Sequence, residues 1–250
     1  MLLLVDIGNT RVKWATCVDG RVGPQHAAEH AGWTADDWRR TLFASPQIER
    51  VVAASVAGEQ ARGAMAAAAE RNGVREVRFI ASTAAAAGVR NAYPEPRLLG
   101  VDRWVAVIGA YHLKRRACCV VDVGTAATID AVDDHGLHLG GFIVPGPHLM
   151  VHSLHSGTSD LAAHTAASPA GTDSLFADNT RDAIARGCRV ALAALIDRSH
   201  AELARATGTD PALLCTGGAV GDVLSYVVSE AEVVPDLVLH GLATLAQSGA

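Results

Sequence analysis

The chain has 250 residues, of which 50% are hydrophobic and 4% aromatic, a composition that suits one or two domains with aliphatic cores. With 21 Lys and Arg against 26 Asp and Glu, and no basic run longer than residues 114–116, nucleic acid and acidic membrane are excluded as principal partners. The five cysteines are scattered without a C-x-x-C pair and no apolar run reaches membrane-spanning length, so we expect reduced thiols and a cytoplasmic protein.

The first predicted element is a hairpin at the start of the chain. The apolar run 2–5 ends in Asp6, small residues follow at 8–10, and apolar residues then recur at every second position. This pattern predicts a strand, a tight turn and a second strand. A turn without bulky side chains lets backbone N–H groups approach an anion, while Asp6 and Lys13 can hold a metal and a phosphate. The stretch therefore predicts a binding site for nucleotide phosphates.

The same pattern occurs a second time. The sequence VDIGN at 5–9 returns as VDVGT at 121–125, and Gly20 has a counterpart at the same offset in Gly136. A repeat of this length indicates two like domains rather than a solenoid. Two such hairpins would face one another across a cleft and clamp a polyphosphate from both sides. The alternative is a pair of ordinary hairpins, because Asp and Gly are common turn residues.

Between the two hairpins the pattern predicts a mixed α/β layer. In chain order we expect a strand at 21–29, a helix capped by Thr34 that ends before Pro46, a strand at 51–55, a helix at 59–72 and a strand at 77–81. The stretch 82–99 loses its periodicity and carries one glycine and two prolines, which indicates a substrate-facing loop.

A further helix is predicted to begin at residues 100–103, Gly-Val-Asp-Arg. Apolar side chains from Trp104 to Tyr111 can share one face of it. The carboxylate of Asp102 in its first turn has an ordinary explanation, because the helix macrodipole stabilises a negative charge there.

In the second half we expect strands at 118–123, 126–132 and 138–144, and then a short helix. Within that helix, His148, His152 and His155 have a spacing that can place three imidazoles on one face. A zinc site would need a fourth ligand, so polar residues that line a cleft are the favoured interpretation.

The last part begins with a flexible loop at 157–174 and a long helix from Asn179-Thr180 to about Ala206. From its position alone, Thr180 would be no more than a helix cap. A strand at 213–216 runs into Gly217-Gly218, where a flat ring or a ribose can lie against the backbone, and a final helix occupies 237–246. The long helix is alanine-rich and apolar on more than one face, which favours a homodimer. Its expected buried positions are Ala183, Ile184, Val190, Ala191, Leu195 and Ile196.

Taken together, these motifs resemble those of the type III pantothenate kinases, which belong to the acetate and sugar kinase, Hsc70 and actin superfamily. The resemblance covers the whole chain and rests on six motifs in order: DIGNTRVKW at 6–14, Tyr93 with LLGVDRW at 98–104, DVGTAATID at 122–130, GGFIVPG at 140–146, Asn179-Thr180, and TGG at 216–218.

The resemblance implies an α/β protein of two similar ribonuclease H-like, actin-like ATPase domains, each a mixed five-stranded sheet with flanking helices. Residues 1–116 would carry the phosphate and pantothenate loops. Residues 117–250 would carry a second phosphate loop, the adenosine motif and the dimer interface. The implied activity is ATP-dependent phosphorylation of pantothenate to 4'-phosphopantothenate, the first step of coenzyme A biosynthesis.

The resemblance also implies the roles of individual residues. Asp102 would be the catalytic base, Asp122 would bind potassium or ammonium, and Asp6 would bind Mg²⁺, directly or through a water. The pantothenate site would be Tyr93, Gly100, Val101, Asp102 and Arg103, with Thr180 from the neighbouring subunit of a homodimer. The ATP site would be Asp6, Ile7, Gly8, Asn9, Thr10, Arg11, Val12, Lys13, Thr125, Gly217 and Gly218.

Two other functions remain open at this point. One is a non-catalytic nucleotide-sensing or regulatory module, since a fold does not determine an activity. The pair Asp102-Arg103 argues against it, because a protein that only binds ATP needs no base. The other is a sugar or short-chain acid kinase of the same superfamily.

Overall fold

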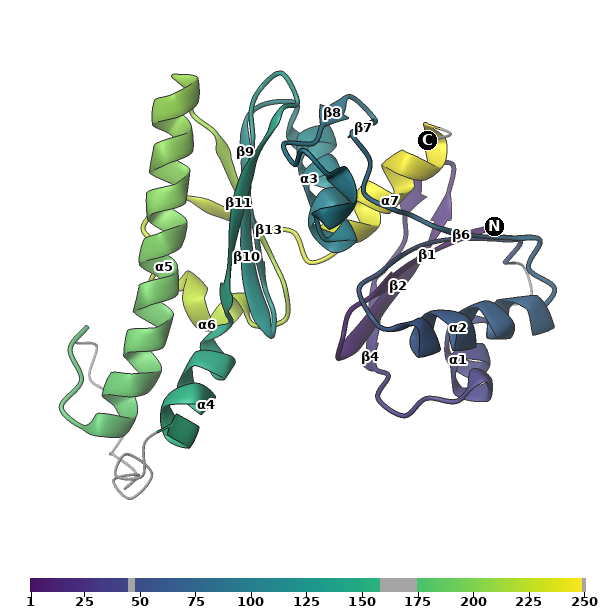
Figure 1. Cartoon of the computed structure of the whole chain (residues 1–250), viewed down its shortest axis with the longest axis horizontal. Coiled ribbons are helices and arrows are strands. Elements are labelled where there is room, and N and C mark those ends of the chain that lie inside the picture. The colour runs from purple at the N-terminus through teal and green to yellow at the C-terminus, as the bar shows by residue number, and fades with distance from the viewer. Residues whose placement is uncertain (45–47, 158–174, 249–250) are drawn as a thin grey trace. The chain divides into compact units, whose positions relative to one another are not determined.

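The computed structural model describes residues 1–44, 48–157 and 175–248, which form two compact units (Figure 1). The first unit consists of Met1–Arg115, His135–Gly140 and Asp236–Ala250, and the second of Arg116–Asp134 and Gly141–Pro235. The division after Arg115 lies next to the predicted boundary. The segment His135–Gly140 and the last helix, which the sequence analysis placed in the second domain, belong to the first unit.

The first unit is built on a mixed sheet of six strands. They are β1 (Leu2–Ile7), β2 (Arg11–Val18), β3 (Arg21–Val22), β4 (His26–Glu29), β5 (Arg50–Ser55) and β6 (Glu76–Phe79), in the order β3-β2-β1-β5-β6, with β4 also on β2. Strand β2 is antiparallel to β1, whereas β5 and β6 run parallel to it. The predicted strand at 21–29 is two short strands, since Pro24 between them has no N–H to donate to β2. The sheet therefore has six strands and not five.

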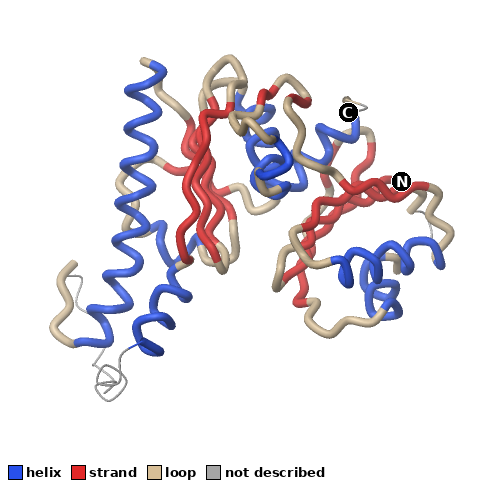
Figure 2. Tube along the Cα trace, in the orientation of Figure 1, coloured by secondary structure: helices blue, strands red, loops and turns tan. Residues whose placement is uncertain are grey.

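Helices cover both faces of this sheet (Figure 2). One face packs Leu3, Val5 and Ile7 against Trp38 of α1 (Ala35–Leu42) and Met65 of α2 (Glu59–Arg71). On the other face, α3 (Val101–Lys114) contacts β5, and α7 (Leu237–Gln247) contacts β1, β2, β3 and β5. The alternation of buried residues along β1 thus supplies two hydrophobic layers.

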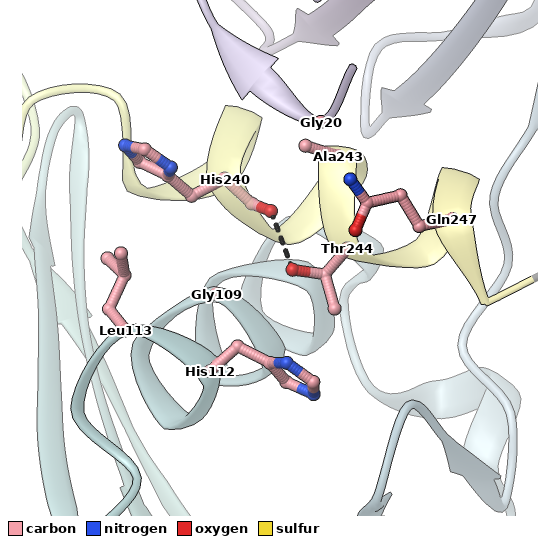
Figure 3. Close-up of a pocket in the computed structure, with 8 residues that line it drawn as sticks. All are labelled: Gly20, Gly109, His112, Leu113, His240, Ala243, Thr244 and Gln247. Carbon is pink, nitrogen blue, oxygen red and sulfur yellow. Dashed lines mark hydrogen bonds between the residues drawn. The ribbon is translucent and has the colours of Figure 1, made fainter.

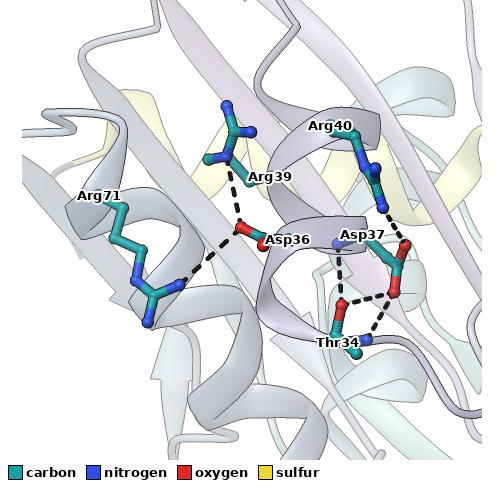
Figure 4. Close-up of polar contacts among 6 residues, drawn as sticks. All are labelled: Thr34, Asp36, Asp37, Arg39, Arg40 and Arg71. Atoms are coloured by element: carbon teal, nitrogen blue, oxygen red, sulfur yellow. Dashed lines mark hydrogen bonds and ion pairs between the residues drawn. The ribbon is translucent and has the colours of Figure 1, made fainter.

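The start of α1 is fixed by a capping box (Figure 4). The hydroxyl of Thr34 accepts from the N–H of Asp37 at 3.3 Å, and the Asp37 carboxylate accepts from the N–H of Thr34 at 2.9 Å. The pKa of Asp37 is lowered to about 2, mainly by the hydrogen bond from the Thr34 hydroxyl. The N–H of Thr34 and the guanidinium of Arg40 lower the pKa further by their own hydrogen bonds. An ion pair of 3.9 Å between Asp36 and Arg71 links α1 to α2. The predicted cap at Thr34 is confirmed, and it sets the position of Trp38 in the core.

Two glycines explain why the last helix belongs to the first unit. A Cβ at Gly241 of α7 would lie 2.0 Å from the carbonyl oxygen of Val105 in α3. A Cβ at Gly109 of α3 would lie 2.6 Å from the carbonyl oxygen of Leu237. The two helices therefore meet backbone to backbone, a contact between distant parts of the chain that hydrophobic periodicity does not reveal.

The predicted loop at 82–99 has local structure of its own. It contains the short strands β7 (Ala85–Ala86) and β8 (Val89–Arg90) and the 3₁₀ helix η1 (Pro96–Leu98). The N–H of Arg90 donates to the carbonyl oxygen of Gly136 at 2.8 Å, which joins this loop to the segment His135–Gly140 of the same unit. The loop is thereby joined to this segment at the end of its short hairpin.

The second sheet repeats the plan of the first. It consists of β9 (Cys118–Val123), β10 (Ala126–Val132), β11 (His138–Pro145), β12 (Ala212–Thr216) and β13 (Ala231–Val233), in the order β11-β10-β9-β12-β13. Strand β10 is antiparallel to β9, and β12 is parallel to β9. In the first sheet β2 is likewise antiparallel to β1, and β5 is parallel to β1. The corresponding turn residues Gly20 and Gly136 have φ of +78° and +77°. The predicted repeat is confirmed at the level of the fold.

The helices of the second unit are α4 (Pro147–Gly157), α5 (Thr180–Thr207) and α6 (Val220–Leu224). Helix α5 buries Leu192 and Ile196 against Val121 and Ile129 of the sheet. Of its predicted core positions, Ala183 and Ala191 are exposed, because the face toward the sheet runs through Cys188, Leu192, Ala193, Ile196 and Leu203. The predicted loop at 157–174 lies, from residue 158 on, outside the described residues.

Among the helices within residues 1–44, 48–157 and 175–248, none is long and apolar enough to cross a membrane.

Candidate active site

The first predicted phosphate turn, residues 8–10, joins β1 to β2. Asp6 lies opposite Lys13 in the strand register, and its side chain is 9% exposed. The N–H of Gly8 donates to the carbonyl oxygen of Arg11 at 3.0 Å and closes the turn. Asn9, Thr10 and Arg11 are exposed. The turn therefore presents backbone and polar groups to solvent beside a buried carboxylate.

Two residues of the predicted phosphate loop contribute differently. Ile7 and Val12 are 0% exposed and pack in the core under α1 and α2. Their side chains cannot touch a nucleotide, so only their backbone groups are available for binding. They fix the two ends of the turn and in this way set its shape.

The second phosphate turn, between β9 and β10, is contacted from one side by the GGFIVPG segment. Gly124 N–H donates to the carbonyl oxygen of Ala126 at 2.9 Å, and Gly146 N–H donates to that of Thr125 at 2.9 Å. A Cβ at Gly146 would lie 2.1 Å from the Gly124 carbonyl oxygen. Thr125 itself is exposed. The glycine at 146 is required because the two backbones touch.

The TGG segment contacts the same turn from the other side. Gly217 has φ of +101°, and a Cβ there would lie 2.3 Å from the carbonyl oxygen of Val123 and 2.5 Å from Oδ1 of Asp122. A Cβ at Gly218 would meet nothing within 4 Å. Asp122, Thr125 and Gly217-Gly218, which are far apart in sequence, thus gather at one end of the second sheet, with open space beside Gly218.

The LLGVDRW segment opens α3, with Gly100 as its N-cap residue and Val101 as its first helical residue. Arg103 is 5% exposed; its Nη1 donates to the Tyr93 hydroxyl at 3.1 Å and its Cζ lies 5.9 Å from the centre of the Tyr93 ring. Oδ1 of Asp102 accepts from the N–H of Arg103 at 2.8 Å. The structure therefore brings Tyr93 onto Arg103, beside Asp102, as the sequence analysis expected of a common site.

The sequence analysis missed His138 at this site. The side chain is fully buried, and its ring stacks on that of Tyr93 with centroids 6.3 Å apart and planes 14° from parallel. It is one histidine at the start of a strand, a position that carries no sequence signal. Its ring supports the tyrosine that contacts Arg103.

Thr180 is the first residue of α5 and is half-buried. The helix is capped by Asn179, whose Oδ1 accepts from the N–H of Asp182 at 3.0 Å. The interpretation of Thr180 as the capping residue is therefore wrong. Its hydroxyl stands at the positive end of a long helix.

The three histidines of α4 do not form a common site. Nε2 of His148 lies 3.0 Å from Oδ2 of Asp222 in α6, and Nδ1 of His152 lies 3.3 Å from the Ser156 hydroxyl. Within the described part of the chain, no three His, Cys, Asp or Glu side chains gather as potential metal ligands. His148 links α4 to the helix that follows TGG.

A cavity of about 200 Å³ lies in the first unit between α3 and α7 (Figure 3). Thr244 donates from its hydroxyl to the carbonyl oxygen of His240 at 3.0 Å on one wall. None of the predicted site residues lines it, and the lining contains no group suited to triphosphate chemistry. We therefore do not assign the predicted site to this cavity. The lining residues are Gly20, Gly109, His112, Leu113, His240, Ala243, Thr244 and Gln247.

The buried thiols of β9 and β12 in the second sheet are inert. Burial raises the pKa of the Cys215 thiol to about 12, and burial, with smaller contributions from Cys215 and Asp130, raises the pKa of Cys119 well above its ordinary value. Both side chains pack in the hydrophobic core of the second unit. They remain protonated at neutral pH, so thiolate chemistry plays no part at this site.

Comparison with known proteins identifies relatives over the full length. The sequence model of the family described as type III pantothenate kinase matches residues 2–202. A type III pantothenate kinase from Laribacter hongkongensis is 38% identical over 248 residues, which are 99% of each chain.

Solved structures show the same fold at lower identity. A Baf family protein from Campylobacter jejuni has a TM-score of 0.60 at 21% identity, over 99% of this chain and 98% of that one. Component A of the (R)-2-hydroxyglutaryl-CoA dehydratase from Acidaminococcus fermentans has a TM-score of 0.54 at 13% identity, over 98% and 95%. The α/β fold of two ribonuclease H-like, actin-like ATPase domains is thereby confirmed.

Proposed function

The chain belongs to the type III pantothenate kinase family, and from this premise we propose which of its residues carry out the reaction. The reaction is the ATP-dependent phosphorylation of pantothenate to 4'-phosphopantothenate, the first step of coenzyme A biosynthesis. The observation that carries the assignment is the contact of Arg103 with Tyr93 beside Asp102 at the start of α3. A guanidinium with an aromatic neighbour suits the carboxylate of pantothenate, and a carboxylate beside it suits a hydroxyl that must lose a proton.

Phosphoryl transfer requires alignment of nucleophile and leaving group and neutralisation of charge. The backbone of Gly8 to Thr10 and the ammonium of Lys13 would bind the β- and γ-phosphates of ATP. Thr125 would contact ATP from the second turn. The open space beside Gly218 is where adenosine would lie against the backbone.

The acidic residues fit two cations. Asp6 is a buried carboxylate next to a turn of exposed backbone, which suits Mg²⁺ held directly or through a water. Mg²⁺, when bound, neutralises charge on the phosphates. A Cβ at position 217 would lie only 2.5 Å from Oδ1 of Asp122. Because residue 217 is a glycine, that space beside the carboxylate stays free of protein atoms. We assign potassium or ammonium to that space.

The monovalent cation should be required for activity. Without it, the Asp122 carboxylate would repel the phosphates of ATP, because like charges at short distance disfavour one another. We expect kcat/KM for ATP in sodium-only buffer to be lower than in potassium or ammonium by about tenfold, the change that about 1.4 kcal/mol produces. The assay is run at constant ionic strength with choline chloride as the balance. Equal activity in sodium and potassium would contradict the assignment of Asp122.

At the acceptor end, Arg103 would pair with the pantothenate carboxylate, with Tyr93 against its guanidinium and the backbone of Gly100 and Val101 beside it. Asp102 would accept the proton of the primary hydroxyl as it attacks the γ-phosphate. The function is tested by offering the purified protein pantothenate, a panel of sugars and a panel of short-chain acids with ATP. Transfer to a sugar or acid in place of pantothenate would favour a different kinase of the superfamily, and no transfer at all would favour a nucleotide-sensing module.

The active unit is proposed to be a homodimer formed by the second unit. Large apolar side chains of β11 and α4 are exposed, among them Phe142 at 53% and Ile143 at 62%. Helix α5 exposes small residues at one face, Ala183, Gly187, Ala191 and Ala194, which allow close approach of a second helix. An exposed apolar surface of this kind supports burial against a second copy.

Thr180 is expected to contact pantothenate bound by the neighbouring subunit. Thr180→Ala should then raise KM for pantothenate by about tenfold and leave KM for ATP nearly unchanged. A lost hydrogen bond of about 1.4 kcal/mol corresponds to a tenfold change.

Subunit mixing tests whether the contact crosses the interface. When Thr180→Ala and Asp102→Asn chains form mixed dimers, one site carries both defects and the other carries neither, so activity should return. A protein that sediments as a monomer at assay concentration and is fully active would refute the shared site.

We also propose a cytoplasmic location, which the composition of the protein supports. All five cysteines are free and buried, as expected in a reducing compartment.

A further inference from the structure

His30, which no motif includes, makes two contacts with the first phosphate turn. It follows β4 at the edge of the first sheet, and its side chain is 7% exposed. Its Nε2 lies 2.7 Å from the carbonyl oxygen of Gly8, so this nitrogen carries the hydrogen and donates. Its backbone N–H donates to the carbonyl oxygen of Thr10 at 3.3 Å. One residue therefore holds two carbonyl groups of a three-residue turn.

The contact with Gly8 determines which way the next N–H points. A trans peptide unit is planar, and its C=O and N–H lie on opposite sides. Because the Gly8 carbonyl is directed at the buried imidazole, the N–H of Asn9 in the same peptide unit is directed away from it. Asn9 and Thr10 are the exposed part of the turn. The imidazole thus turns a backbone donor toward the side where an anion can approach.

The imidazole is itself held in place. Its ring centre is 5.4 Å from that of Trp38 and 6.5 Å from that of Trp33, and the two indoles are 5.0 Å apart, edge to face. The carbonyl oxygen of His30 accepts from the N–H of Trp33 at 3.1 Å. Trp38 is on α1, whose start is fixed by the Thr34 capping box (Figure 4). The turn is in this way connected to the hydrophobic core of the first unit.

A buried histidine can satisfy a ring nitrogen with any polar group nearby, and such a bond by itself indicates no function. Here the polar atom is directed at the carbonyl of a glycine in a turn that must keep one shape to bind phosphate. We propose that His30 is a positioning residue that orients the peptide between Gly8 and Asn9 for the phosphates of the nucleotide. The proposal rests on the proposed function for the identity of the anion as ATP phosphate.

Three variants separate positioning from packing. His30→Phe keeps an aromatic ring among the tryptophans but has no donor. His30→Gln places an amide N–H near the position of Nε2 and should restore the contact. His26→Phe is the matched control, because His26 lies on β4, the strand that His30 follows, is exposed, and stacks on Trp14 with ring centres 5.6 Å apart.

The measurements are the dissociation constant of ADP with Mg²⁺, the dissociation constant of pantothenate, and hydrogen exchange of a peptide that covers 8–11, all on the full chain. We expect His30→Phe to weaken ADP binding three- to tenfold and to speed exchange in that peptide, with pantothenate affinity unchanged. His30→Gln should recover most of the loss, and His26→Phe should match the wild type.

Unchanged ADP affinity in His30→Phe, or an equal loss of ADP and pantothenate affinity in both His30 variants, would overturn the proposal. If His30→Phe fails to fold, His30→Gln decides: ADP affinity within twofold of the wild type supports the donor role, and a full tenfold loss with normal thermal stability refutes it. All of these outcomes are read from binding, hydrogen exchange and thermal stability, and none depends on turnover. A wild type that binds ADP but does not phosphorylate pantothenate would refute the proposed function and leave the test of His30 intact.

Discussion

Asp102→Asn should lower kcat by about 10² to 10⁴, the usual cost of losing a general base, with ATP affinity and the fold unchanged. Asparagine has nearly the same shape, and its Oδ1 can still accept from the N–H of Arg103, a bond that the carboxylate makes at 2.8 Å. What the variant loses is the ability to take a proton. The effect should therefore fall on kcat and not on the KM for either substrate.

The matched control is Asp36→Asn. Asp36 is likewise in the first turn of a helix, α1, and its exposed carboxylate pairs with Arg39 at 3.7 Å and Arg71 at 3.9 Å. Its loss should leave kcat within twofold of the wild type, because exposed ion pairs contribute little. If Asp102→Asn behaved in the same way, Asp102 would serve only to stabilise the start of α3 through the helix macrodipole.

The two tight turns, between β1 and β2 and between β9 and β10, could be predicted because each depends on local chemistry. Small residues after an apolar run permit a tight turn, and the return of the pattern at 121–125 indicates the second copy. The parallel placement of β12 beside β9 brings Gly217 next to Asp122, a contact that the sequence analysis did not predict. The cap predicted at Thr34 likewise follows from residues adjacent in sequence, and it is confirmed.

The features that sequence did not reveal depend on contacts between distant segments. Helix α7 joins the first unit through Gly109 and Gly241, and no pattern within the helix indicates its partner. His30 and His138 are single histidines at strand ends, and what they contact is decided by the tertiary fold. On α5, Ile196 is buried as predicted, whereas Ala183 and Ala191 are exposed, because alanine occurs on several faces of this helix and its apolar periodicity is weak.

One added methyl group at Gly217, in the second unit, should have a large effect on the use of ATP. Its φ of +101° is strained for any other residue, and the Cβ of an alanine would lie 2.3 Å from the Val123 carbonyl oxygen and 2.5 Å from Asp122 Oδ1. Backbone on one side and a carboxylate on the other leave no flexible neighbour to move. The chain must shift where it passes Asp122, together with the start of α6.

We expect Gly217→Ala to lower kcat/KM for ATP by about 10²-fold, the scale of loss that a displacement of about 1 Å produces in a reacting assembly. The affinity for pantothenate should be unchanged, because the residues predicted to bind pantothenate, other than Thr180, belong to the first unit. Gly221→Ala is the control: it lies four residues further on in α6, and a Cβ there meets nothing within 4 Å, so alanine should be neutral or slightly stabilising. The two variants are compared with the wild type by steady-state kinetics in which each substrate is varied in turn. Thermal denaturation of both variants measures their stability. Wild-type kcat/KM for ATP in Gly217→Ala would show that the contact between TGG and Asp122 has no part in binding the nucleotide.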